Sequence, residues 1–126
     1  MKKYLTSHFR ISALALMLAS GSLIAAQIAD PAADQKAAID AMHHKLHDDQ
    51  AAYKAAEAQA LKELNEMTVQ EGVKIDELNA KIDELMAAKL QILRLRYGHL
   101  VEMRAILTDE QKVAYDKGVL SRTAVR

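Results

Sequence analysis

The longest helical pattern in the chain covers residues 73–107 and constrains the fold more than any other feature. Apolar residues recur along it in steps of mostly three and four, at Ile75, Leu78, Ile82, Leu85, Met86, Leu90, Leu93, Tyr97, Leu100, Met103 and Leu107. That spacing is typical of one face of an α-helix. No proline interrupts it, so the pattern predicts one helix, beginning at Val69 or Val73, with a length of about 50 Å. A single small core cannot cover such a helix, and a second helix must lie along it.

The residues before this stretch supply the partner helix. Asp30 and Pro31 suit a cap and a first helical position, and the same apolar rhythm continues through Ile39, Met42, Leu46, Tyr53, Ala56, Ala60, Leu64 and Met67. A turn is expected between Asn65 and Gly72, where Thr68 and Glu71 have the spacing of a capping box. The sequence therefore predicts an all-α fold, a long antiparallel helical hairpin.

One short motif occurs twice. Leu107-Thr108-Asp109-Glu110-Gln111 contains a capping box, in which Thr108 and Gln111 satisfy each other's backbone N–H groups. It predicts a short C-terminal helix through Val113 and Tyr115 that folds back on the open end of the hairpin and ends at Gly118 or Leu120. Leu46-His47-Asp48-Asp49-Gln50 has the same outline, but histidine is a poor cap. We expect a bend near His47 rather than a break, and a straight helix remains the alternative.

Residues 1–26 have the pattern of an export signal. Lys2, Lys3 and Arg10 form a positive end, and an apolar run of about sixteen residues follows, with cleavage expected near Ala25 or Ala26. An uncleaved membrane anchor is the competing interpretation, although the run is short for a spanning helix of about 20 residues. In either case residues 27–126 are expected to form a single helical-hairpin domain in the periplasm.

Composition narrows the class of protein. Hydrophobic residues make up 51% of the chain but aromatic residues only 4%, which predicts helices packed through small aliphatic side chains, a thin core and a homodimer. Cysteine is absent, so disulfides and thiolate ligands are excluded. Without the signal's three basic residues, 14 basic and 17 acidic residues remain, a net charge of −3. With no basic stripe, nucleic acid is not expected as a partner.

Catalytic machinery is also hard to find. Ser121 is the only serine beyond the signal, and the sequence contains no glycine-rich phosphate loop. The acidic pairs at residues 76–77 and 83–84 lie opposite the apolar stripe, as on a solvated helix face. We therefore expect a protein that is not an enzyme.

Histidines provide the most specific chemistry. His43 and His47 are spaced i, i+4, so that both rings can hold one ion, with His44 between them and Asp40 one turn earlier. His99 and Met103 repeat that spacing on the long helix. Imidazole and thioether ligands favour Ni, Co, Cu or Zn over Mg or Ca. These residues are the candidate metal ligands.

The same residues have a simpler interpretation as an exposed polar cluster, a satisfied histidine and a core methionine. A turn centred between residues 67 and 70 sets His99 beside residues 35–40. His43 then lies three to eight residues out of register, or about 5–12 Å along the axis. A bend near His47 or a dimer contact would be needed to close that gap.

The motif at residues 105–112 resembles the LTxxQ helix start of the Spy/CpxP-like periplasmic stress proteins, with residues 46–50 as a degenerate first copy. His99 and Met103, followed by Ala114-Tyr115-Asp116, resemble the heavy-metal sensor and resistance branch, including CnrX-like and zinc-resistance-associated proteins. The resemblance implies a dimeric four-helix hairpin. It also implies ligand roles for His43, His47, His99 and Met103, and Glu57 is the nearest match to a further glutamate ligand.

Two functions follow as hypotheses. The first is a non-enzymatic periplasmic metal-binding protein for heavy-metal sensing or resistance, acting through a membrane-bound regulatory partner in the sensor case. The alternative is an ATP-independent chaperone or envelope-stress modulator that binds unfolded exported proteins on an apolar face. A lipid-surface protein is a third interpretation, and the missing basic face counts against it.

Overall fold

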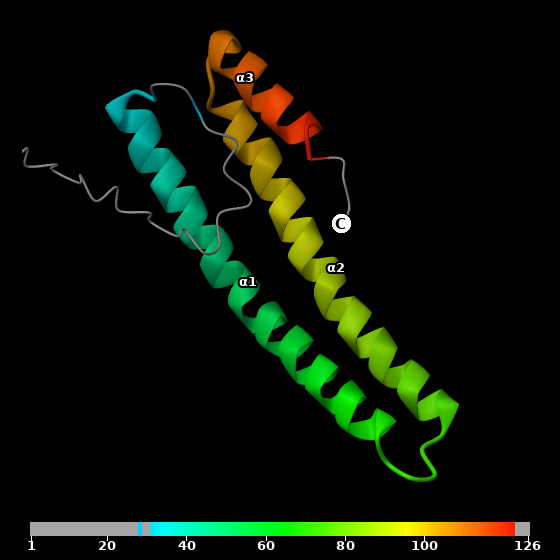
Figure 1. Ribbon diagram of the computed structural model, residues 1–126. Helices are drawn as coiled ribbons and strands as arrows, with labels where there is room; N and C mark the ends of the chain where they lie inside the picture. The colour runs from blue at the N-terminus through cyan, green and yellow to red at the C-terminus, as the bar shows by residue number, and fades with distance from the viewer. Residues whose placement is uncertain (1–27, 29–30, 123–126) are drawn as a thin grey trace, which may run out of the picture.

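The computed structural model describes Ile28 and residues 31–122. These residues form three helices and no strand: α1 (Ala33–Thr68), α2 (Ile75–Ala105) and α3 (Asp109–Leu120). Figure 1 shows α1 and α2 side by side and antiparallel, with α3 folded back along the end of α2. The predicted all-α hairpin with a short C-terminal helix is therefore confirmed. The expected signal or anchor, residues 1–26, lies outside the described residues.

Helix α1 runs through the degenerate motif without interruption. It is one helix of 36 residues, and Figure 1 shows it following a shallow curve rather than a sharp kink. A break there, the less favoured expectation, does not occur, because residues 46–50 keep helical hydrogen bonding and Lys45 pairs with Asp49 along the surface. The helix begins at Ala33 with Ala32 as its N-cap, so Pro31 is not its first residue as predicted, and Asp30 lies outside the described residues.

The turn between the long helices lies later than the sequence suggested. Thr68 is the last residue of α1, and its hydroxyl donates to the carbonyl oxygen of Leu64 at 2.7 Å. The predicted capping box at Thr68 is therefore wrong, and α2 begins at Ile75 rather than at Val69 or Val73. Gly72 has a φ of 75°, which is accessible to glycine at little cost. The turn thus occupies residues 69–74.

The second motif behaves as predicted. The Thr108 hydroxyl accepts from the Gln111 N–H at 3.3 Å, and Gln111 Oε1 accepts from the Thr108 N–H at 3.0 Å. This capping box starts α3, which continues through Gly118 to Leu120. The longer of the two expected helices, ending at Leu120, is confirmed, and Gly118 does not end α3.

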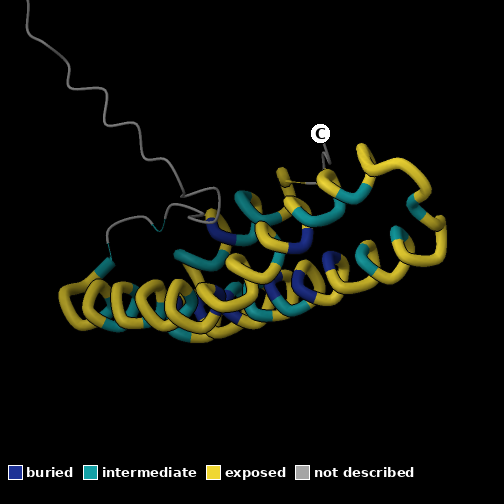
Figure 2. The backbone as a smooth tube through the Cα atoms, turned by 90° about the horizontal axis from the view of Figure 1, so that it is seen from below, coloured by how far each residue is buried: buried dark blue, intermediate teal, exposed yellow. Residues whose placement is uncertain are grey.

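The best-packed region is the open end of the hairpin, where three helices meet. Met103, Leu107 and Tyr115 form its buried cluster, joined by the partly buried Ile39 and Met42. The Tyr115 hydroxyl donates to the Leu100 carbonyl oxygen at 2.9 Å, which fastens α3 to α2. Figure 2 shows buried positions only where helices face one another, with exposed outer faces. None of the described helices is both apolar and long enough to cross a bilayer.

Candidate metal centre

The imidazoles of His43 on α1 and His99 on α2 lie against each other, with His43 at an exposed position and His99 at a buried one. Their ring centroids are 5.2 Å apart and the rings are tilted by 45°. The expected gap of three to eight residues between His43 and His99 is therefore wrong. The turn at residues 69–74 centres the hairpin near residue 71, and this position sets His43 level with His99.

His99 lies in a desolvated position. His99 is only 5% exposed. This burial lowers its pKa below the usual value of 6.5; nearby His43 lowers the pKa further, and Glu102 opposes the lowering. His99 is therefore held neutral near pH 7. Neutral imidazole is the form of histidine that binds metals.

The separation of the two rings fits a shared ion. With metal–nitrogen bonds of about 2.0–2.1 Å and tetrahedral ligation, two imidazole ligands of one ion have ring centres about 5 Å apart. The ring separation of His43 and His99 agrees with that value. The two residues have the chemistry and the spacing for half of a tetrahedral site, and a bound ion would cross-link α1 to α2.

Met103 follows His99 by one turn but belongs to the hydrophobic cluster. It is buried with Leu107 and Tyr115, so the interpretation of Met103 as a core methionine describes its packing. A thioether at this position remains close in sequence and on the same side of α2 as His99.

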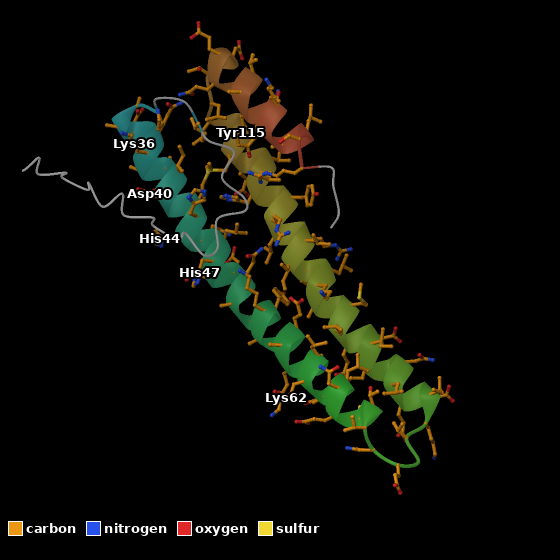
Figure 3. All side chains as sticks on the ribbon, in the orientation of Figure 1. Lys36, Asp40, His44, His47, Lys62 and Tyr115 are labelled. Atoms are coloured by element: carbon orange, nitrogen blue, oxygen red, sulfur yellow. The ribbon has the colours of Figure 1, made fainter. Side chains whose placement is uncertain are left out.

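Four other candidates are not brought to this pair. Figure 3 shows Asp40, His44 and His47 on the outer side of α1, away from α2. The His47 side chain is 80% exposed, and its Nδ1 lies 3.5 Å from the Asp48 carboxylate. Glu57 forms an ion pair with Lys89 at 2.9 Å. It lies fourteen positions beyond His43, about 21 Å along the helix.

Within residues 31–122, no three histidine, aspartate or glutamate side chains are grouped closely enough to hold a metal ion. The contact between the two imidazoles therefore joins one sequence-predicted ligand from α1 to one from α2.

A small cavity of about 120 Å³ opens beside His99, between α1 and α2. Its lining combines the apolar residues Met42, Leu46 and Leu95 with a charged group, which consists of Lys45, Asp49, Arg94 and Glu102. Sequence reasoning missed this charged group, although Glu102 lies one turn after His99. Gly98 also borders the cavity, and a Cβ atom there would meet nothing within 4 Å. The glycine is therefore not needed for close helix approach.

Two glutamine side chains form hydrogen bonds that connect α1 to other parts of the chain. None of these bonds was predicted from the sequence. The Gln50 side chain, from a residue only 2% exposed, donates to the Ile92 carbonyl oxygen at 3.1 Å. Gln35 donates to the Ile106 carbonyl oxygen at 3.0 Å and to Gln111 Oε1 at 2.9 Å. The available signal for Gln50 was its place in the three-four apolar rhythm, because a polar residue on a buried face needs a partner.

Comparison with known proteins gives one match. A family model described as LTXXQ motif family protein matches residues 24–118. No curated protein and no solved structure matched the chain.

Proposed function

Because the chain belongs to the LTXXQ motif family, we propose that it is an exported, non-enzymatic protein that binds a transition-metal ion between α1 and α2. The family makes it a Spy/CpxP-like protein, and metal sensing or resistance is the role that we assign within that group. Ni, Co, Cu or Zn is the expected ion, since the candidate ligands are imidazoles and a thioether.

The contact between His43 and His99 is the observation that carries this proposal. It joins residues 56 positions apart at a ring separation of 5.2 Å, and one of the two is held neutral in a buried position. Two imidazoles on different helices are a common basis for a transition-metal site.

His47 and Met103, each four positions after one of the two imidazoles, are the residues that we expect to complete the coordination. His47 lies one turn after His43, and its exposed side chain is free to change rotamer. Met103 lies one turn after His99. Solvent completes the site if neither joins, because water molecules can occupy the coordination positions that two imidazoles leave open.

Titration calorimetry with Ni, Co, Cu and Zn tests the proposal. We expect binding tighter than millimolar, lost in His43→Ala and His99→Ala and retained in the matched control His44→Ala. Weaker binding by His47→Ala would add His47 to the ligands. Affinity should fall at acidic pH, because protons compete with the ion for imidazole. Binding that His99→Ala leaves unchanged would reject the site.

A second candidate function is a chaperone-like role, supported by a separate hollow on the hairpin. An open cavity of about 520 Å³ lies between α1 and α2 nearer the turn. Its lining consists of Tyr53, Ala56, Ala60, Ala87 and Ala88 together with the polar residues Gln59, Glu63, Glu84 and Gln91. Such an apolar surface can accept side chains of an unfolded protein.

Suppression of client aggregation would test this candidate. We expect suppression to be insensitive to a chelator and to His99→Ala but weakened by Ala87→Glu, with Ala55→Glu on the exposed surface as control. The absence of suppression at stoichiometric ratios would remove the chaperone role.

A further inference from the structure

The open cavity near the turn has an acidic end as well as an apolar lining. Small side chains make up most of the apolar part, at Ala56, Ala60, Ala87 and Ala88. Tyr53 lies at the end nearer the histidine pair, and Glu63 and Glu84 lie at the end nearer the turn. Ten positions separate Tyr53 from Glu63 on α1, about 15 Å along the helix. The cavity is therefore elongated, with chemically different ends.

The size of this cavity is that of a small-molecule site. Its volume is about 520 Å³, and pockets for small organic ligands commonly have volumes of about 300–1,000 Å³. Such pockets are mostly apolar and use a few polar groups to orient the ligand. The dimensions and lining thus fit a ligand with an apolar body and one polar head group.

Two carboxylates at the acidic end share one ammonium group. Lys81 Nζ lies 2.5 Å from the Glu63 carboxylate and 2.7 Å from the Glu84 carboxylate. Lys62, on the other side of Glu63 in the sequence, is already paired with Glu66 at 3.7 Å. None of the described residues that line the cavity is basic. The two carboxylates and Lys81 therefore leave a net charge of −1 at this end.

Glu63 keeps its negative charge over a wide pH range. Hydrogen bonds from Lys81 and Gln59 hold the pKa of the Glu63 carboxyl below its usual value of 4.5. The surrounding part of the hairpin has the same sign, since residues 59–84 contain seven acidic and three basic residues, for a net −4. A positively charged head group is attracted to this end, and a negatively charged one is repelled.

We propose that the cavity binds a small lipophilic cation, whose amine or quaternary ammonium group lies beside Glu63 and Glu84 and whose apolar body lies along the alanines toward Tyr53. This site goes beyond the proposed metal binding, because His99 is not among the residues that line the cavity. It lies where the chaperone candidate would hold apolar side chains, but it requires a positive charge on the ligand and no unfolded protein.

Titration calorimetry with three matched probes tests the preference for a cation. Octyltrimethylammonium, octyl sulfate and 1-octanol carry the same chain with a cationic, an anionic and a neutral head group, and each is used below the concentration at which it forms micelles. We expect a dissociation constant below about 1 mM for octyltrimethylammonium and binding at least about tenfold weaker for octyl sulfate. The preference should decrease as sodium chloride is added, because salt screens the carboxylates.

The acidic end is tested by three substitutions on α2. Glu84→Gln leaves one carboxylate for Lys81, so binding of octyltrimethylammonium should weaken by about threefold to tenfold. Asp83→Asn is the matched control, since it removes the same charge at an exposed position outside the lining, and it should leave binding unchanged. Lys81→Gln removes the competing ammonium and should strengthen binding. Circular dichroism establishes that the three variants are folded.

The apolar part of the cavity is tested by filling it. Ala87→Phe should abolish binding of octyltrimethylammonium, and Ala55→Phe, at an exposed position outside the lining, should not. His99→Ala should also leave this binding unchanged. Because His99→Ala is expected to abolish metal binding, failure of the cation site and failure of the metal site are distinguishable.

Four results would overturn the proposal. The first is no binding of octyltrimethylammonium up to about 1 mM, and the second is binding of octyl sulfate with equal affinity. The third is an equal loss of affinity in Glu84→Gln and Asp83→Asn, which would place the effect in the overall charge of the protein. The fourth is an unfolded client that Ala87→Glu prevents from binding while octyltrimethylammonium does not bind, which would assign the cavity to the chaperone role.

Discussion

Gln50 on α1 donates a hydrogen bond from Nε2 to the carbonyl oxygen of Ile92 on α2, at 3.1 Å. Gln50 follows His43 by seven positions, and Ile92 precedes His99 by seven, so both contacts belong to one register of the hairpin. The glutamine of the degenerate motif does not cap a helix. It fixes how α1 and α2 are aligned, and that alignment puts the two imidazoles together.

Replacing Gln50 should therefore cost stability. Gln50→Ala is expected to lower the free energy of unfolding by about 1–3 kcal/mol, because it removes a buried hydrogen bond and the packing of the side chain. Urea unfolding followed by circular dichroism measures this. Gln59→Ala is the control, since Gln59 is exposed and bonds only to Glu63 on its own helix; its effect should be within about 0.5 kcal/mol. Equal losses in the two variants would contradict the role given to Gln50.

The two threonines followed by an acidic or amide residue three positions later should respond differently to the same substitution. Thr108→Ala should lower stability by about 1 kcal/mol, because Thr108 caps α3. Thr68→Ala should change it by less than about 0.5 kcal/mol, because an exposed threonine at the end of α1 bonds only back to Leu64. Thermal unfolding of both variants makes the comparison, and a larger effect at Thr68 would favour the capping box that the sequence suggested there.

The two glycines near helices should give effects of opposite sign. Gly98→Ala should raise stability by about 0.5–1 kcal/mol, since the residue lies inside α2 and a Cβ meets open space. Gly72→Ala should lower it by about 1 kcal/mol, because φ at this position is 75°. Chemical unfolding of the pair tests both, and destabilisation by Gly98→Ala would show that the cavity beside it has no room for a methyl group.

Stability should depend on the protonation of His99. Burial lowers its pKa in the folded state, so below about pH 6.5 the unfolded chain binds a proton that the folded chain resists. The contribution of the neutral, buried His99 to the free energy of unfolding is fully present above pH 6.5. It is lost as the pH falls toward the lowered pKa of the folded state. His99→Leu should remove this part of the slope below about pH 6.5, and His44→Leu, at an exposed position, should not. A metal-free sample is required, because a bound ion would add its own pH dependence. An unchanged slope in His99→Leu would contradict the desolvation of that ring.

Periodicity was sufficient for the architecture. The apolar stripe of α2 and the matching rhythm of α1 predicted the hairpin, because a long one-sided helix has few ways to bury its face. The box at Thr108 was recognisable because a leucine precedes it and a helical pattern follows it.

The register between α1 and α2 could not be predicted from the sequence. A threonine with a glutamate three positions later suits a capping box, but Thr68 bonds backward to Leu64 instead, and the turn shifts toward residue 71. Moving the centre of a hairpin by one position changes the facing residue by two. This shift of the turn brings His43 level with His99, whereas the predicted turn would have placed them several residues out of register.

The side of α1 to which each histidine projects was also not predicted from the sequence. His43, His44 and His47 look equivalent in the sequence, yet only His43 meets a ring from α2. Which histidine contacts His99 depends on the direction in which each side chain leaves α1. Three neighbouring polar residues do not by themselves indicate that direction.

The buried apolar cluster lies at the end of the hairpin where α3 joins. Near residues 69–74 only α1 and α2 pack against each other, through small side chains such as Ala60. Native-state hydrogen exchange should therefore be graded along the molecule, with the amides near the loop opening first in a local excursion and those beside Tyr115 only on global unfolding. Local opening would then begin near the turn at residues 69–74. The contact between His43 and His99, which lies nearer the open end of the hairpin, would be lost only in the larger opening events.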